Sequence, residues 1–301
     1  MSSFVRFTRF GLLALALALP GAAFAQDEEA PAEGGDATEP AEGGDATEPA
    51  EGTDGVATVG GSDASLEAGA GVYTKATWPT EETKRPITLT KGMLQINGNI
   101  GVSMSKELVG KPIVVTPNVF YGVSDKLTIG LVNSSLCVTG KDNGCAKAFN
   151  SLGLDVIFAF MTGKLNVGAH GGVAIPQLSD PMLAGVKVGV LGKYMAGKIA
   201  VTFDPSLYIG ITERDFNKEG LDVPVHVAFQ ATPKLAPFLH TGISAPLDGF
   251  GDFYQVPVGV GALFGMSNKL DIGGQFTFAN LAGKGSSADF RAVNIFCNFR
   301  M

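Results

Sequence analysis

The stretch Ser124-Asp125-Lys126-Leu127-Thr128-Ile129-Gly130 joins a short turn to a run in which apolar and small polar residues alternate. The same pattern, a turn ending in Lys and then alternation, returns at Lys164, Lys198, Lys234 and Lys269, in steps of 38, 34, 36 and 35 residues. Successive side chains of a β-strand point to opposite faces, so a period of two predicts strands rather than helical repeats. The repeating unit is therefore a β-hairpin followed by a longer loop.

The composition of the 301-residue chain suits one large β domain, with 41 glycines for turns and close strand contacts. Beyond the N-terminus, no stretch approaches the roughly 18 consecutive apolar residues of a membrane-spanning helix, so a membrane form would be a barrel. The net charge of -7 is uneven, because residues 1–91 hold 15 of the 29 acidic and 6 of the 22 basic residues. The acidity therefore belongs to the N-terminal region.

Residues 1–25 have the pattern of a secretory signal peptide. Arg6 and Arg9 give a basic start, residues 10–19 an apolar core, and Ala23-Phe24-Ala25 a small-x-small cleavage site. Export would place the three cysteines in an oxidising compartment. No Cys follows the apolar core, so a lipoprotein anchor is not expected.

Two further segments precede the predicted strands. Residues 26–61 contain an acidic nine-residue repeat, Pro31 to Glu39 and again Pro40 to Glu48, which has too little apolar area to offset the entropy of ordering. We expect a disordered spacer there. Residues 62–91 are mixed in composition and include the only Trp, Trp78. This segment is either a linker or a plug that folds into the lumen or across the periplasmic mouth of a barrel.

From residue 92 onward, strands alternate with turns. The pattern predicts twelve strands, approximately Met93–Ser105, Val114–Val123, Lys126–Val138, Leu152–Met161, Leu165–Ile175, Val186–Tyr194, Lys198–Ile211, Val223–Ala231, Leu235–Ala245, Tyr254–Phe264, Leu270–Asn280 and Ala288–Phe299. The Lys-marked turns are short, and the intervening links are longer and rich in Gly, Asp, Pro, Asn and Ser. Short turns on one side and long loops on the other are typical of outer-membrane barrels, and an even strand number places both chain ends in the periplasm.

The two faces of each predicted strand differ in chemistry. Leu94, Ile96 and Ile100 alternate with Gln95, Asn97 and Asn99, and later strands behave similarly. A soluble sandwich would also alternate, with its apolar face as the core. Large apolar residues run along nearly every strand to aromatic ends, as a lipid-facing band requires: Phe158, Phe160, Tyr194, Phe264, Phe276 and Phe278. The sequence therefore predicts an all-β, antiparallel transmembrane β-barrel of about twelve strands over residues 92–301.

Over residues 92–301 the chain resembles the outer-membrane β-barrel proteins of Gram-negative bacteria, broadly the porin-like group. The most specific part is the C-terminal alternation that ends in an aromatic residue, here Val293, Ile295, Cys297, Phe299 and Met301. The chain departs from the usual pattern at Met301, which stands where a terminal Phe is typical. The resemblance implies insertion by the barrel assembly machinery and a location in outer-membrane lipid.

Ten polar residues on the other face are candidates for lining the lumen: Asn97, Asp155, His170, Lys187, Lys193, Asp204, His226, His240, Asp271 and Gln275. Imidazole is the commonest metal ligand, but the three histidines lie on separate strands without tight spacing, so we expect no metal and no cofactor. The charged residues either line an aqueous path or pair across strands and brace the interior.

The chain has three cysteines and no recognisable catalytic motif. Cys137 and Cys145 flank a turn-rich loop, where a disulfide is expected, and Cys297 is expected to be a small apolar residue of the lipid face. No G-x-S-x-G elbow accompanies the histidines, and no basic stripe suggests nucleic-acid binding. The leading hypothesis is a porin-like passive channel for small solutes; the alternatives are a non-conducting structural or adhesion barrel and, less favoured, a lipid-active enzyme. The sequence does not indicate an oligomeric state.

Overall fold

The computed structural model describes residues 73–106, 109–140, 143–145, 147–283 and 285–301. The predicted signal peptide, the repeat segment 26–61 and residues 62–72 of the next segment lie outside the described residues. In the described part of the chain, no helix is long and apolar enough to cross a membrane.

The described chain is almost entirely β-structure. Two short helices occur, the 3-10 helix η2 at Glu82–Lys84 and α1 at Phe250–Phe253. The strands are β1 Leu94–Ser103, β2 Ile113–Ser124, β3 Leu127–Val132, β4 Leu136–Cys137, β5 Leu152–Met161, β6 Leu165–Gln177, β7 Leu183–Ala196, β8 Ile199–Phe203, β9 Ser206–Gly210, β10 Gly220–Phe229, β11 Leu235–Pro246, β12 Val256–Gly265, β13 Leu270–Ala282 and β14 Ser287–Arg300.

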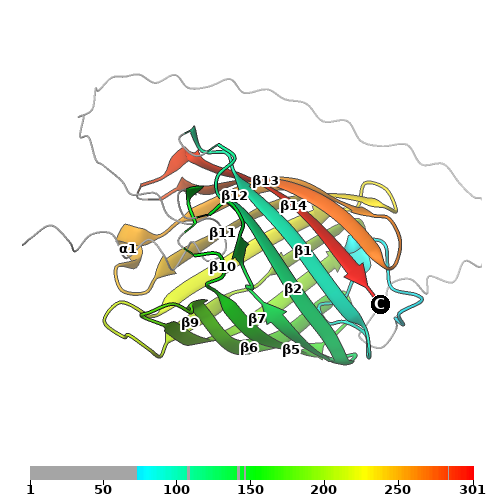
Figure 1. Cartoon of the computed structure of the whole chain (residues 1–301). Coiled ribbons are helices and arrows are strands. Elements are labelled where there is room, and N and C mark those ends of the chain that lie inside the picture. The colour runs from blue at the N-terminus through cyan, green and yellow to red at the C-terminus, as the bar shows by residue number, and fades with distance from the viewer. Residues whose placement is uncertain (1–72, 107–108, 141–142, 146, 284) are drawn as a thin grey trace, which may run out of the picture. The chain divides into compact units, whose positions relative to one another are not determined.

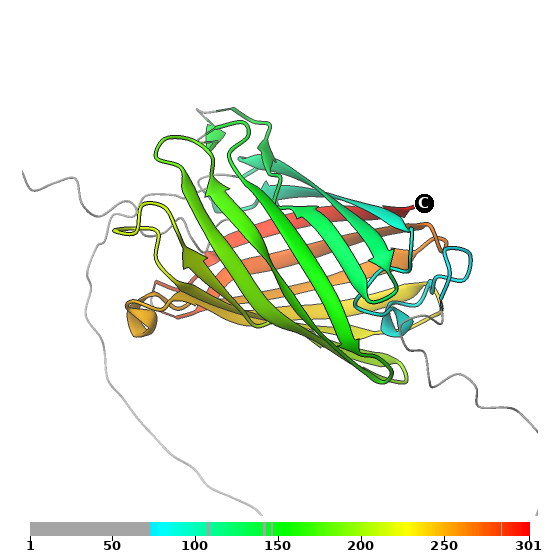
Figure 2. The same ribbon diagram turned by 90° about the horizontal axis from the view of Figure 1, so that it is seen from below.

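These strands form one closed antiparallel barrel (Figures 1 and 2). Neighbours in sequence pair along the wall, and β1 closes the sheet by pairing with both β14 and β2. β3 and β4 both pair with β2, and β8 and β9 both pair with β7 and β10, so each couple is one interrupted strand. The fourteen strands therefore fill twelve positions, as the sequence predicts.

Two predicted strands are broken, and each break has a local cause. The expected strand Lys126–Val138 is interrupted after β3, where Asn133 has a φ of 56°, a left-handed conformation that ends a ladder. The expected strand Lys198–Ile211 is interrupted at Asp204-Pro205, because proline has no N–H to donate. The strand Leu152–Met161 is confirmed at both ends as β5.

The large apolar side chains of the strands point outward. Every wall position contributes at least one that is exposed: Ile100, Tyr121, Ile129, Phe158, Leu165, Tyr194, Ile209, Phe229, Leu239, Val260, Ile272 and Ile295. These faces are therefore not the core of a soluble sandwich, because an apolar band of this extent in water would drive association. The inward face carries polar residues and glycine, together with a few aromatic rings such as Phe120, Phe238 and Phe296.

The two ends of the barrel differ. At one end, called here the short-turn end, brief hairpin turns join β2 to β3, β5 to β6, β7 to β8, β10 to β11 and β12 to β13. β1 begins and β14 finishes there, since the backbone of Leu94 bonds that of Met301 in both directions at 2.9 Å. The longer links lie at the opposite end. The one cluster of buried large side chains in the described residues, Trp78, Leu89 and Met93, also belongs to the short-turn end.

Candidate functional site

Residues 73–91, called here the plug segment, lie across the short-turn end of the barrel (Figures 1 and 2). Their contacts are spread around the wall. Hydrogen bonds join the segment to three turns: Thr88 Oγ1 to the carbonyl of Asp125 at 2.7 Å, Thr80 Oγ1 to the carbonyl of Pro233 at 3.4 Å, and Asn268 Nδ2 to the carbonyl of Ala76 at 2.9 Å. Residues 73–91, the described part of the segment 62–91, therefore contact the barrel at several points around its short-turn end.

Arg85 anchors the plug segment to the wall through a buried ion pair. Its two terminal nitrogens donate to the two carboxylate oxygens of Asp271 at 2.9 and 2.8 Å. The Asp271 side chain is 0% exposed and also accepts a hydrogen bond from Arg300 of β14. A bidentate guanidinium–carboxylate pair fixes both distance and orientation. Asp271 is therefore a docking point for the plug segment as well as a lumen residue.

Glu82 makes the second ionic contact, with Lys193 of β7. Lys193 Nζ lies 2.9 Å from the Glu82 carboxylate and also donates to the Glu82 backbone carbonyl at 2.9 Å. Burial alone would raise the pKa of Glu82, but the cations Lys193 and Arg85 outweigh it and lower that pKa to about 2. Glu82 is thus ionised at neutral pH and bridges the plug segment to the wall.

His170 lies between two carboxylates on the lumen face. Its Nε2 is 2.7 Å from Asp204 Oδ1 and its Nδ1 is 3.4 Å from Asp155 Oδ1. Asp204 occupies the break between β8 and β9, and Gly189 leaves room for the ring, because a Cβ there would lie 2.2 Å from Nε2. Three predicted lumen residues, two from strands and one from the break between β8 and β9, therefore form one group of paired side chains.

His226 and His240 are directly opposite each other in the ladder of β10 and β11. From the sequence they were expected on separate strands without tight spacing, although each is seven residues from Pro233 in the turn that joins these strands. The His226 ring stacks at a tilt on Phe238, with centroids 4.6 Å apart. In the described part of the chain, no group of three or more His, Cys, Asp or Glu side chains is arranged to hold a metal ion.

The other lumen candidates lie in a belt of amides and hydroxyls. Asn97 donates to Asn298 at 2.7 Å and accepts from Asn118 at 3.4 Å, which links β14, β1 and β2. Gln275 donates to Thr277 on its own strand. Lys187 of β7 is half-buried. Lys193 and Asp271 were predicted from the sequence, but their partners in the plug segment, Glu82 and Arg85, were not, because their only signal is that they are charged residues near the unique Trp.

The remaining residues singled out in the sequence are the cysteines and the alternating residues of the C-terminal strand. Cys137 and Cys145 are bonded, with Cα atoms 5.7 Å apart, and close the loop after β4. Cys297 is a free, exposed thiol. Val293, Ile295, Cys297, Phe299 and Met301 occupy alternate positions, and of these Ile295, Phe299 and Met301 are exposed apolar residues on the outside.

No protein-family model and no curated protein sequence matches the chain. Among solved structures, it is similar to the KdgM porin, with 5% identity, a TM-score of 0.48, and coverage of 68% of this chain and 98% of that one. Omp33 of Acinetobacter baumannii gives 12% identity, a TM-score of 0.39, and coverage of 70% and 99%. OmpF of Salmonella typhi gives 9% identity, a TM-score of 0.39, and coverage of 69% of this chain and 96% of that one. These values are too low for a functional argument, but the strand ladder itself confirms the predicted fold: the chain forms a closed antiparallel barrel with twelve wall positions.

Proposed function

We propose that this protein is a porin-like passive channel for small solutes, whose short-turn mouth is narrowed by the plug segment. The observation that carries the proposal is the polar, glycine-rich inner face of a closed barrel whose apolar side chains point outward. A hydrated path needs such a lining, because polar groups replace part of the hydration shell of a passing solute.

The same proposal gives a location and partners. The exposed apolar band fits outer-membrane lipid, and the C-terminal alternation that ends near Phe299 fits recognition by the barrel assembly machinery. Both ends of the barrel wall lie at the short-turn end, which would face the periplasm. We propose no enzymatic activity and no nucleic-acid partner.

The second candidate is a non-conducting structural or adhesion barrel. The observation that favours it is the spread of plug contacts, which reach Asp125, Pro233 and Asn268 on three different turns. A segment held at so many points blocks the mouth as long as it stays docked. The two candidates therefore differ in whether solute crosses the barrel. In the channel, solute passes beside the plug segment or after its release, and in the non-conducting barrel it does not pass.

Single-channel conductance in planar bilayers separates them. Arg85→Ala removes the pair with Asp271, the bond to Glu82, and donors to the backbone carbonyls of Pro79 and Thr80, so it should loosen the plug segment. The matched control is Lys84→Ala, because Lys84 pairs only with Glu81 at the exposed surface of the same segment. We expect small openings in the unmodified protein, larger ones in Arg85→Ala, and no change in the control. Absence of conductance in all three would reject the channel in favour of the non-conducting barrel.

A further inference from the structure

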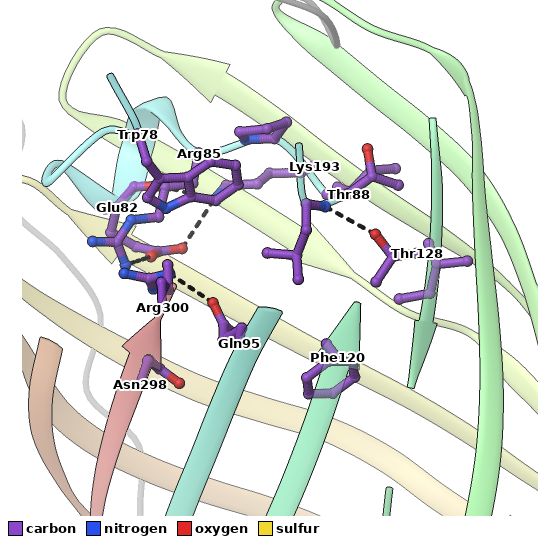
Figure 3. A pocket seen from close by; sticks show the side chains of 14 residues that line it. Trp78, Glu82, Arg85, Thr88, Gln95, Phe120, Thr128, Lys193, Asn298 and Arg300 are labelled. Atoms are coloured by element: carbon purple, nitrogen blue, oxygen red, sulfur yellow. Dashed lines mark hydrogen bonds and ion pairs between the residues drawn. The ribbon is translucent and has the colours of Figure 1, made fainter. Parts of the chain in front are cut away.

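A cavity of about 270 Å³ lies between the plug segment and the barrel wall (Figure 3). Trp78, Glu82, Arg85 and Thr88 border it from the plug segment, and Gln95, Phe120, Lys193 and Arg300 from the wall. Pockets for small molecules begin at roughly 300 Å³, so this one has room for a compact ligand only.

Positive charge is in excess around the cavity. Arg85, Lys193 and Arg300 line it. Their counter-ions are Glu82, which also lines it, and Asp271, which is bonded to both arginines. Three cations therefore face two carboxylates, and one further negative charge would balance the group.

Two residues of the cavity wall also carry buried donors without a partner in the described structure. Arg300 is 3% exposed, and although its Nε donates to Gln95 at 2.7 Å and its Nη2 to Asp271, its Nη1 has no hydrogen-bond partner. Trp78 is 4% exposed, and its indole Nε1 is likewise unpartnered. Unmet buried donors cost free energy, roughly 1–3 kcal/mol each, and are rare in native proteins. Both donors lack an acceptor, and because each nitrogen is closed off from the cavity in this structure, a ligand would reach them only after a neighbouring side chain shifts.

The remaining wall of the cavity is apolar. The Trp78 ring, which has the Arg300 guanidinium 5.8 Å from its centroid, is joined by Phe120 of β2 and by Leu89 of the plug segment. Inorganic anions gain nothing from such a surface, whereas a compact hydrophobic group does. The cavity thus combines cationic donors on one side with aromatic and aliphatic surface on the other.

We propose that this cavity binds a small organic monoanion, a carboxylate carried on a compact aromatic or branched apolar body. The carboxylate balances the excess positive charge of the cavity and, after a shift of a neighbouring side chain, accepts hydrogen bonds from Arg300 and Trp78, while the apolar body packs on Phe120 and Leu89. This site goes beyond the proposed channel and does not depend on conductance. Because its two walls belong to the plug segment and the barrel, an occupant stabilises the docked arrangement.

Trp78 is the only Trp of the chain, so its fluorescence reports on this cavity directly. The folded full-length protein in detergent is titrated with benzoate, with benzamide as the neutral isostere and with acetate, which lacks the apolar body. We expect a saturable change with benzoate, and binding roughly tenfold or more weaker for the other two, because a charge-assisted bond or the apolar contact is lost.

Variants test the assignment of the residues. Arg300→Lys keeps a cation beside Asp271 but removes the unpartnered nitrogen, and Phe120→Leu removes the aromatic surface; each should weaken benzoate binding several-fold. Phe296→Leu, a lumen aromatic that does not line the cavity, is the matched control and should bind benzoate as the unmodified protein does. Heat-modifiable migration verifies that each variant is folded. A non-saturable benzoate response, equal binding of benzamide, or equal weakening in the Phe296→Leu control would overturn the proposal.

Discussion

Neutralising Asp271 should release the plug segment while leaving the barrel closed. Its fully buried carboxylate receives two hydrogen bonds from Arg85 and one from Arg300. In Asp271→Asn the side chain keeps its size and one acceptor oxygen, but two buried guanidinium groups lose the anion that they share. Asp271 is near the start of β13, whose backbone ladder with β12 and β14 does not involve this side chain.

The size of the effect follows from the burial of the pair. Removing one partner of a buried ion pair typically costs about 3–5 kcal/mol, because the remaining charge stays desolvated. Arg85 retains its bond to Glu82, and Asn still accepts a hydrogen bond, so the lower end of this range applies. A loss of about 3 kcal/mol lowers the docking equilibrium of the plug segment by roughly a hundredfold, since each 1.4 kcal/mol is a factor of ten.

Acrylamide quenching of Trp78 measures the docked fraction, because this side chain is buried in the docked state and is the sole Trp. In a urea titration, the Trp78 transition of Asp271→Asn should move to lower urea while heat-modifiable migration persists. The control is Asp248→Asn, which removes an exposed pair with Lys218 and should leave Trp78 unchanged. Equal protection of Trp78 in Asp271→Asn and the unmodified protein would refute the docking role of this ion pair.

Two further predictions concern Glu82 and Gly189. The pKa of Glu82 is lowered from 4.5 to about 2 by Lys193, so its stabilisation of the docked plug segment is complete above about pH 4.5 and is lost as pH falls toward 2. Trp78 quenching should therefore rise over that interval, and Glu82→Gln should lack this acid transition; an identical acid transition in the variant would contradict the assignment. Gly189→Ala places a Cβ against the His170 ring and should destabilise the barrel by about 1–3 kcal/mol in urea unfolding, whereas Gly251→Ala, with open space around it, should not. Equal stability of both variants would show that the ring can move aside without cost.

The barrel wall was predictable because its signal is local. Alternation along residues 152–161 determines which side chains face out, and the turn before Lys164 determines where the chain reverses. The same logic fails where a single residue breaks the ladder. Asn133 belongs to a continuous predicted strand, and only its left-handed backbone separates β3 from β4. Strand ends also differ from the predicted ones by a few residues, because pairing with the neighbouring strand, and not alternation alone, determines where a strand ends.

Of the candidate site, only the residues of the barrel wall were predictable from the sequence. Lys193 and Asp271 stand out in the sequence as charged residues on the predicted inner face, where the expected partners were residues of other strands. Asp271 does pair with Arg300 of the neighbouring strand, but the other partners are Glu82 for Lys193 and Arg85 for Asp271. Glu82 and Arg85 lie more than a hundred positions away in the chain, in a segment without alternation. Non-local pairing of this kind leaves no periodic trace. The opposition of His226 and His240 was recoverable, because the register of a hairpin follows from the position of its turn.

The chemistry of the plug interface is that of a reversible contact, as release of the segment in the proposed channel would require. Its apolar part is small, with Trp78 and Leu89 packed near Met93, and most of its fixed contacts are hydrogen bonds and ion pairs. Charged groups recover their hydration when such an interface separates, whereas a permanently sealed core would bury a continuous apolar face. The barrel needs none of these contacts for closure, because β1 pairs with both β2 and β14. The free energy of docking therefore depends on a few charged groups. Low pH, a bound anion and the Arg85 and Asp271 variants should all shift the same equilibrium, that between the docked and the released plug segment.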